Sequence, residues 1–368
     1  MVKKISGTPK MIRLLNKDLI EGIIRQNGPI TQPELAEITN LSLVTVNKTV
    51  VVLLEENKIK SNGMKKSTGG RKAQTYVYND ELSYYIGLYF EKDAYIGVVS
   101  NSIGKVIFKE IYPARAFEYD LMMEDTFFAL DQLIVECEKH DIAAIGIGVP
   151  GVVHNGTISE IPFIPCWEGE QIGDILYQKY KMPILLENDV NLAVIGLYRA
   201  KYKDKVKNMA LIYLEHGIGA GLIINEELYS GCTNFAGELS FLTIDGRGEK
   251  LMHKKYNGNF EQRIITMNEL LEDIQTEEIK ELLLETIVEG MLSLICILNP
   301  EVIVIKNRYI KKKDLDVMNK KMEEFIKRGN LPKLVSAEDL TEYSIKGVID
   351  MCLLETTSSY SISNGKGE

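Results

Sequence analysis

Several side chains near the N-terminus are of the types that read DNA. Hydroxyl and amide groups bond to base edges or phosphate oxygens, and cationic groups neutralise phosphates. Residues 42–48 bring such groups close together, and two more cations follow a glycine pair at positions 69–70. The residues that we predict to contact DNA are Ser42, Thr45, Asn47, Lys48, Arg71 and Lys72.

The elements expected to position these residues form a helix-turn-helix. Apolar residues at helical spacing predict a first helix over residues 11–26 with one apolar stripe. The segment 31–34, Thr-Gln-Pro-Glu, reads as a capping box for a short second helix, and Ser42 is the natural N-cap of a third. In this arrangement the third helix enters the major groove by its N-terminal end. The residues expected to face inward are Leu35, Ala36, Ile38, Val46, Val50, Leu53 and Leu54.

A hairpin is expected after the third helix. Residues 57–61 and 73–78 read as two strands around the basic loop 65–72, KKSTGGRK, which is typical of a wing. A cation after a flexible glycine pair can enter the adjacent minor groove. The alternative is a protein-docking module whose basic run is a solvated loop.

Charge separates this segment from the rest of the chain. Residues 1–78 carry a net charge of +7, which leaves −16 on residues 79–368. Such asymmetry indicates a head that binds a polyanion. We therefore expect a winged helix-turn-helix DNA-binding domain over residues 1–78, with the wing and linker at about 57–80.

The acidic remainder has the pattern of an α/β body. Three apolar runs from residue 84 predict an antiparallel start, and strands then alternate with helices. We expect a body over residues 81–355 with two lobes. One covers about 81–190 plus the C-terminal helix, and the other about 191–340. Residues 356–368, rich in Ser, Thr and Gly, are expected to form a disordered tail.

The sequence also indicates the cellular compartment. Nothing in it resembles a signal peptide or a membrane span, so we expect a cytoplasmic protein with no membrane partner. The cysteines are five in number and include no C-x-x-C pair, which argues against a disulfide framework and a cysteine zinc site. We expect small buried hydrophobes at Cys137, Cys166, Cys232, Cys296 and Cys352.

Five sequence motifs give the body a recognisable order. They are Gly146–Gly151, Glu187–Asn191, Gly217–Gly221, Phe235–Glu238 and Leu298–Val304. With them, the body resembles the ROK family (repressors, open reading frames and sugar kinases), which has a two-lobed actin-like ATPase fold. The head, including Thr-Gly-Gly-Arg-Lys at 68–72, is similar to the winged helix of the family's xylose and N-acetylglucosamine repressors. The resemblance covers about residues 11–355.

This resemblance implies a nucleotide site that has been altered. In the family's kinases, glycine-rich loops let backbone N–H groups approach the ATP phosphates. Here Glu91 and Lys92 replace glycines of the first loop, Glu215 and His216 stand in the second, and residues 306–307 replace a later Gly-Gly. Because phosphoryl transfer depends on positioning and on neutralising phosphate charge, we predict that the chain does not use ATP and is not an enzyme.

The resemblance also implies a reduced sugar site. Asp189 matches the family's catalytic base, and we predict that Asn188, Asp189 and Glu238 contact a sugar effector. Alternatively, Asn188 and Asp189 merely cap the helix that they begin, and Glu238 belongs to a surface ion pair. Phe163 and Trp167 lie where the family's sugar pocket has a polar stretch, although Trp167 also suits a core position.

The expected cofactors are therefore none. The family's Glu-x-x-His histidine is replaced by Phe241, and its zinc-binding cysteines are missing from residues 243–249, which argues against structural zinc.

Together these features predict a DNA-binding transcriptional regulator, a repressor of carbohydrate-metabolism genes such as those for xylose. We expect a homodimer or homotetramer that binds a palindromic double-stranded operator and senses a small carbohydrate. One alternative is an ATP-dependent sugar kinase with an atypical nucleotide site. Another is a regulator that has lost its effector.

Overall fold

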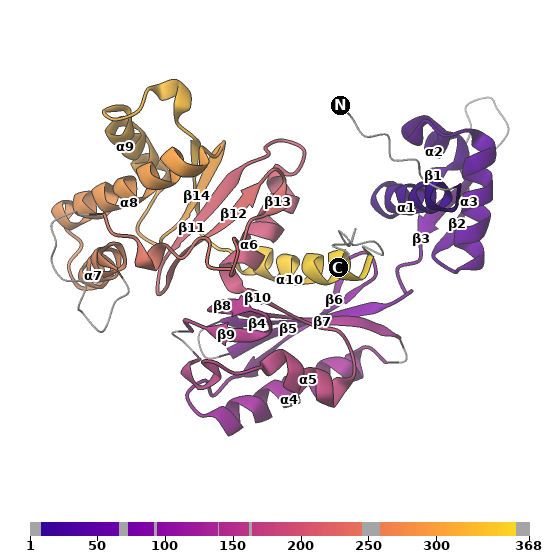
Figure 1. Ribbon diagram of the computed structural model, residues 1–368, viewed down its shortest axis with the longest axis horizontal. Coiled ribbons are helices and arrows are strands. Elements are labelled where there is room, and N and C mark those ends of the chain that lie inside the picture. The colour runs from indigo at the N-terminus through magenta and orange to yellow at the C-terminus, as the bar shows by residue number, and fades with distance from the viewer. Residues whose placement is uncertain are drawn as a thin grey trace, which may run out of the picture. The chain divides into compact units, whose positions relative to one another are not determined.

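The structure is a computed structural model that describes residues 9–65, 73–91, 94–138, 140–161, 164–244 and 258–357. The chain divides into two compact units. The first, here called the head, comprises residues 1–84 with 100–107 and 137–142, and the second, the body, comprises the remainder. Figure 1 shows the elements of both units.

The head is a winged helix-turn-helix. Its elements are α1 (Pro9–Asn27), β1 (Ile30–Thr31), α2 (Gln32–Thr39), α3 (Leu43–Glu55), β2 (Ile59–Met64) and β3 (Gln74–Tyr78). The strands form an antiparallel sheet in the order β1-β3-β2. The capping box is confirmed: Thr31 Oγ1 accepts the Glu34 N–H at 3.4 Å, and the Glu34 carboxylate accepts the Thr31 N–H at 2.9 Å. Ser42 is the N-cap of α3, as predicted.

The inward faces of α2 and α3 are narrower than predicted. Leu35, Val46, Val50 and Leu53 are fully buried in the head core, and Ala36 packs against it. Leu54, however, is exposed. The buried residues of α3 follow the i, i+4, i+7 line of one helix face, and Leu54 lies about 100° further round.

Another apolar prediction for the head was wrong, and the apolar stripe of α1 is buried only in part. Ile38 of α2 is exposed, because the inward line of that short helix runs from Leu35 to the partly buried Thr39. In α1, only the C-terminal half packs. Ile20 and Ile24 are buried, whereas the earlier residues of the apolar stripe are exposed, namely Ile12, Leu15 and Leu19.

The first lobe of the body is built on a five-stranded sheet with the order β10-β7-β4-β5-β6. Its strands are β4 (Tyr84–Glu91), β5 (Ala94–Asn101), β6 (Val106–Pro113), β7 (Ile142–Val149) and β10 (Ile184–Asn188). β10 runs parallel to β7. The lobe also contains α4 (Tyr119–Glu136), the hairpin of β8 (Val152–His154) and β9 (Thr157–Ser159), a 3₁₀ turn (Pro165–Trp167) and α5 (Ile172–Tyr180).

The second lobe is built on another five-stranded sheet, in the order β13-β12-β11-β14-β15. Its strands are β11 (Met209–Leu214), β12 (Ile218–Ile224), β13 (Glu227–Leu228), β14 (Val302–Lys306) and β15 (Lys333–Ala337). β12 is antiparallel to β11, and β14 is parallel to both β11 and β15. The helices of this lobe are α7 (Asn259–Asp273), α8 (Glu277–Leu298) and α9 (Lys312–Glu323).

Two helices join the lobes. α6 (Asp189–Leu197), which continues as a π-helical turn (Tyr198–Tyr202), and α10 (Thr341–Thr357) lie between the two sheets (Figure 1). Leu192 and Val348 pack into the core of the first lobe, whereas Val194 packs into that of the second. The helices cross at two glycines: a Cβ on Gly196 would lie 1.9 Å from the Tyr343 carbonyl oxygen, and one on Gly347 would lie 1.9 Å from that of Leu192.

Some predicted features need correction. The sequence did not predict α5, the β8–β9 hairpin or β15. The predicted tail 356–368 overlaps the last two residues of α10 and from residue 358 lies outside the described residues. Cys137 and Cys352 are buried and Cys166 is partly buried, but Cys232 and Cys296 are exposed, because Cys232 lies in a loop and Cys296 on the outer face of α8.

No single helix within the described ranges is long and apolar enough to cross a membrane. Only α2 and α3 taken together, across a bend of 117°, pass that test by length and composition.

Candidate functional site

The start of α3 presents most of the residues that were predicted to contact DNA. Asn47 and Lys48 are exposed on this helix. The Ser42 hydroxyl accepts the Thr45 N–H at 3.2 Å and lies 2.9 Å from the Thr45 hydroxyl, so these two side chains hold each other at the N-terminus of the helix. Ser42 thus has a capping role beside any contact with DNA. The remaining predicted contacts, Arg71 and Lys72, lie outside the described residues.

Two apolar residues at the same helix start were missed. Leu43 is 47% exposed and Val44 is 64% exposed. Apolar side chains in the major groove contact the methyl group of thymine, so these residues suit base reading as well as the polar ones do. Their position directly after the N-cap was the available signal.

The base of the wing is fixed to α2. Lys65, at the end of β2, forms an ion pair with Glu34 of the capping box. Hydrogen bonds from Lys65 and Thr31 to this carboxylate lower the pKa of Glu34 to about 2. The capping box therefore begins α2 and also anchors the first strand of the wing.

A cavity of about 1100 Å³ in the body is lined by residues from both lobes. It lies where several strands end, since Glu91, Asn188, Glu215 and Lys306 follow or close β4, β10, β11 and β14. The site residues Asn188, Asp189 and Glu238 all line it, as do Glu91, Glu215 and His216. Lys92 lies outside the described residues.

The side chain of Asn188 forms hydrogen bonds with backbone groups. Its Oδ1 accepts the N–H groups of Val190 at 2.9 Å and Asn191 at 3.0 Å, and its Nδ2 donates to the Gly151 carbonyl at 3.0 Å. The residue is therefore the N-cap of α6 and also ties the helix to the turn after β7. The capping alternative is the one that the geometry supports for Asn188.

Asp189 is differently placed. Its side chain lines the cavity, and its Oδ1 accepts the adjacent Val190 N–H at 2.8 Å. Burial raises the pKa of Asp189 to about 7. A carboxyl group with such a pKa is present in both forms near neutral pH, so it can donate a hydrogen bond to a sugar hydroxyl or accept one.

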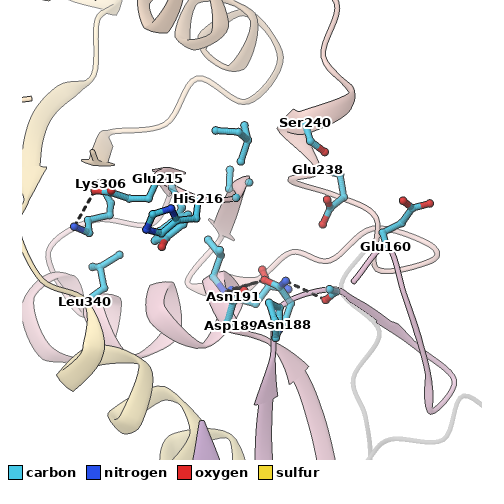
Figure 2. Close-up of a pocket in the computed structure, with 18 of the residues that line it drawn as sticks. Glu160, Asn188, Asp189, Asn191, Glu215, His216, Glu238, Ser240, Lys306 and Leu340 are labelled. Atoms are coloured by element: carbon cyan, nitrogen blue, oxygen red, sulfur yellow. Dashed lines mark hydrogen bonds and ion pairs between the residues drawn. The ribbon is translucent and has the colours of Figure 1, made fainter. Parts of the chain in front are cut away.

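Glu238 shares the cavity with Asp189. Burial, followed by the negative charges of Asp189 and Glu160, raises the pKa of Glu238 to about 7. Figure 2 shows Glu238 and Glu160 on one side of the cavity, with Asp189 below them. The charged groups that act on Glu238 are acidic, which does not match the alternative of a surface ion pair.

A glycine fixes the loop that carries Glu238. Gly237 has φ +97°, and a Cβ there would lie 1.9 Å from the Ala220 carbonyl oxygen. Its own carbonyl accepts the Ala220 N–H at 2.7 Å. The loop is thereby held on β12, and only glycine fits at this position.

On the other side of the cavity, Glu215 is bound by two cations. Its Oε1 lies 3.0 Å from Lys306 Nζ, and its Oε2 lies 2.7 Å from Arg308 Nε. The residue is only 6% exposed. Burial alone would raise the pKa of Glu215, but the hydrogen bonds from Arg308 and Lys306 outweigh it and hold the pKa below its ordinary value.

This cluster revises the prediction about the lost nucleotide contacts. Glu215 and the Lys306-Asn307 pair are joined, because Lys306 binds Glu215 and Asn307 Nδ2 donates to the Leu214 carbonyl at 2.6 Å. Arg308, which the sequence did not single out, completes the cluster through Glu272 at 2.6 Å. Glu215, Lys306, Arg308 and Glu272 therefore form one ion-paired network.

The structure describes one of the two aromatic residues predicted near the sugar site. Trp167 is fully buried, as a core residue is, and Phe163 lies outside the described residues. Within the described part of the chain, no group of three His, Cys, Asp or Glu side chains is arranged to hold a metal ion. Residues 245–257, which include most of the region where the family's zinc ligands would lie, are outside that part.

Comparisons with known proteins agree with this fold. The chain is 28% identical over 246 residues to the xylose repressor of Bacillus subtilis (strain 168), covering 65% of this chain and 63% of that protein. It is 26% identical over 259 residues to the DNA-binding transcriptional dual regulator NagC of Escherichia coli (strain K12), covering 69% and 62%. The chain thus spans less than two thirds of the length of these curated relatives.

Solved structures show the same architecture. A ROK family transcriptional regulator, homologous to the E. coli MLC protein, superposes with a TM-score of 0.72 at 17% identity, covering 94% of this chain and 98% of that one. The ROK hexokinase of Thermus thermophilus gives a TM-score of 0.62 at 18% identity, covering 75% and 100%. The predicted fold, a winged helix-turn-helix followed by a two-lobed actin-like ATPase fold, is confirmed. The ROK family model matches residues 120–351, more than half of the sequence, and the chain belongs to the ROK family.

Proposed function

We propose that this protein is a DNA-binding transcriptional regulator that represses carbohydrate-metabolism genes. The head reads DNA through α3 and its wing. The body holds a carbohydrate effector in the cavity between its lobes and has no kinase activity. The protein requires neither ATP nor zinc.

The main support for the proposal is the ion-paired side chain of Glu215. A kinase needs free cationic and backbone N–H groups to neutralise the phosphates of ATP. Here the Lys306 and Arg308 side chains are occupied by a carboxylate of the chain itself. The names of the two relatives, a xylose repressor and a DNA-binding transcriptional dual regulator, point in the same direction.

Asp189 and Glu238 supply the contacts expected for an effector. Each has a carboxyl group at the cavity, and carboxyl groups pair well with the hydroxyls of a sugar. Effector binding would close the lobes about α6 and α10 and so change the placement of the heads. For release of DNA, the effector must favour the non-binding arrangement by about 1–3 kcal/mol, the usual size of an allosteric coupling.

The assembly that we propose is a homodimer, or a homotetramer made of two such dimers. A two-fold axis would present two heads to the two halves of a palindrome, with half-sites one or more helical turns apart.

A footprint on the DNA that flanks the gene, with and without common sugars, tests DNA reading and sensing together. We expect protection of a palindrome that a sugar relieves. Asn47→Ala should relax preference at one or two base positions by about 1–3 kcal/mol. Lys48→Ala should instead weaken binding to all sequences and reduce the log–log salt slope by about one. No protection by the wild-type protein would refute the proposal.

The kinase alternative makes the opposite prediction. An assay of ADP release over the same sugars should detect no turnover. Turnover that Asp189→Asn abolishes would identify a kinase, whereas operator binding that no sugar changes would favour a regulator without an effector.

A further inference from the structure

The cavity has few cationic side chains, and they bind one carboxylate in common. Lys306 and Arg308 are the only lysine or arginine side chains among the described residues that line it. Both bind the same carboxylate, that of Glu215, at 3.0 Å and 2.7 Å. Lys306 Nζ also donates to the Glu338 carbonyl at 2.8 Å. Figure 2 shows Glu215 and Lys306 on the side of the cavity opposite Glu238, with the ion pair drawn between them.

The other charged groups that line the cavity are acidic. Within the described residues they are Glu91, Glu160, Glu168, Asp189, Glu238, Glu261 and Asp339. An external anion would therefore meet repulsion from most of the wall. The cations that would attract it are neutralised by Glu215, which is almost fully buried.

We infer that Glu215 is a built-in anionic ligand: its carboxylate fills an anion site formed by Lys306 and Arg308 and so excludes external anions from the cavity. Guanidinium and ammonium groups bind carboxylate and phosphate oxygens by the same charge-assisted hydrogen bonds. The cavity therefore accepts uncharged polyols and rejects nucleotides and phosphorylated sugars. The part that concerns the effector rests on the proposed function, but the filled anion site does not.

A single substitution should open the anion site to external anions. Glu215→Gln keeps the length and shape of the side chain but removes its charge. Arg308 retains an ion pair with Glu272, whereas Lys306 retains only the Glu338 carbonyl. Breaking a buried pair by neutralising one partner leaves an uncompensated charge, which an anion from solution can then neutralise.

Inorganic phosphate is the probe for this site. Its binding to the full-length protein is measured by calorimetry at constant ionic strength, with chloride as the balancing salt. We expect Glu215→Gln to bind phosphate at least about tenfold more tightly than the wild type, as a charge-assisted hydrogen bond of about 1.5 kcal/mol allows. Adding Lys306→Gln to this variant should abolish the gain.

Glu272→Gln is the matched control. Glu272 also pairs with Arg308, but its side chain is 53% exposed and does not line the cavity, so phosphate binding should stay at the wild-type level. A folded Glu215→Gln protein with wild-type phosphate affinity would overturn the inference, as would tight phosphate binding by the wild type.

Two further measurements distinguish failure of the filled anion site from misfolding and from failure of the proposed function. If Glu215→Gln does not fold, thermal melts of Glu215→Asp in phosphate replace it. The shorter carboxylate cannot hold both cations as closely, so phosphate should raise the melting temperature, and no rise would contradict the filled site. DNA binding by the wild type is measured in parallel, because its absence would refute the proposed function without bearing on phosphate.

Discussion

Asp189 and Glu238, the two carboxyl groups at the cavity whose pKa is raised to about 7, make stability depend on pH. The pKa of Glu238 rises from its ordinary value of 4.5 to about 7 in the folded protein. Between those values the unfolded chain has lost a proton that the folded chain retains. The free energy of unfolding therefore falls as pH rises from about 4.5 to about 7 and then levels off.

Glu238→Gln should remove the part of this dependence that comes from Glu238, while the part that comes from Asp189 remains. The variant should be more stable than the wild type above pH 7, on the order of 1–2 kcal/mol after allowance for partial solvation, and similar to it near pH 4.5. Chemical denaturation across this range measures the difference. Glu160→Gln is the comparison: Glu160 is exposed at the same cavity, and loss of its negative charge removes only one of the minor causes that raise the pKa of Glu238, so its effect should be much smaller. A constant difference at all pH values would rule out the titration of Glu238.

At the scale of elements, the crossing of α6 and α10 depends on backbone contact. Gly347 has no room for a Cβ, which would lie 1.9 Å from the Leu192 carbonyl oxygen. Gly347→Ala should therefore force the helices apart and lower the free energy of unfolding by about 1–3 kcal/mol or more. Urea denaturation measures the loss.

Gly173→Ala in α5 is the comparison for that change. Its Cβ would meet Leu186 at an ordinary 3.4 Å, so we expect a neutral or slightly stabilising effect of about 0.4–1 kcal/mol. Equal effects of the two substitutions would mean that the crossing tolerates separation.

Elements that depend on local signals were predicted well from the sequence. The caps at Thr31 and Ser42 are set by residues within three positions, and β11 and β12 coincide with the two apolar runs at 209–214 and 218–224. β15 was missed because the short run at 333–337 is recognisable as a strand only through its pairing with β14.

The site was predictable only in part for the same reason. Asp189 and Glu238 could be named from motifs. The full role of Asn188 could not, because its side chain caps α6 and also binds the Gly151 carbonyl, which is distant in sequence. Glu215 and Lys306 were each predicted to disturb an ATP site. Their mutual contact follows from strand order, which places β14 beside β11 and is not encoded in either local segment.

At the scale of the whole molecule, the two compact units have separate cores. The head core, which includes Ile20, Leu35 and Val50, contains no residue of the clusters that build the body lobes. Multidomain chains of this kind depart from two-state unfolding. We expect calorimetry to show more than one transition.

Operator DNA should move one of these transitions selectively. Under the proposed function DNA binds the folded head, so it should raise the melting temperature of the head transition and leave that of the body in place. A 22-base-pair duplex of unrelated sequence, at equal concentration, serves as the control. A single transition that DNA shifts as a whole would show that the units unfold together.

The ion-paired cluster of Glu215 also bears on how the protein reaches its fold. Glu215 is 91 residues from Lys306 and 93 from Arg308 along the chain. Contacts between such distant segments form only after a large loss of chain entropy, so they come late in folding. An interaction that is absent from the folding transition state changes the unfolding rate and leaves the folding rate almost untouched. We therefore expect the Glu215 cluster to extend the lifetime of the folded second lobe without hastening its formation.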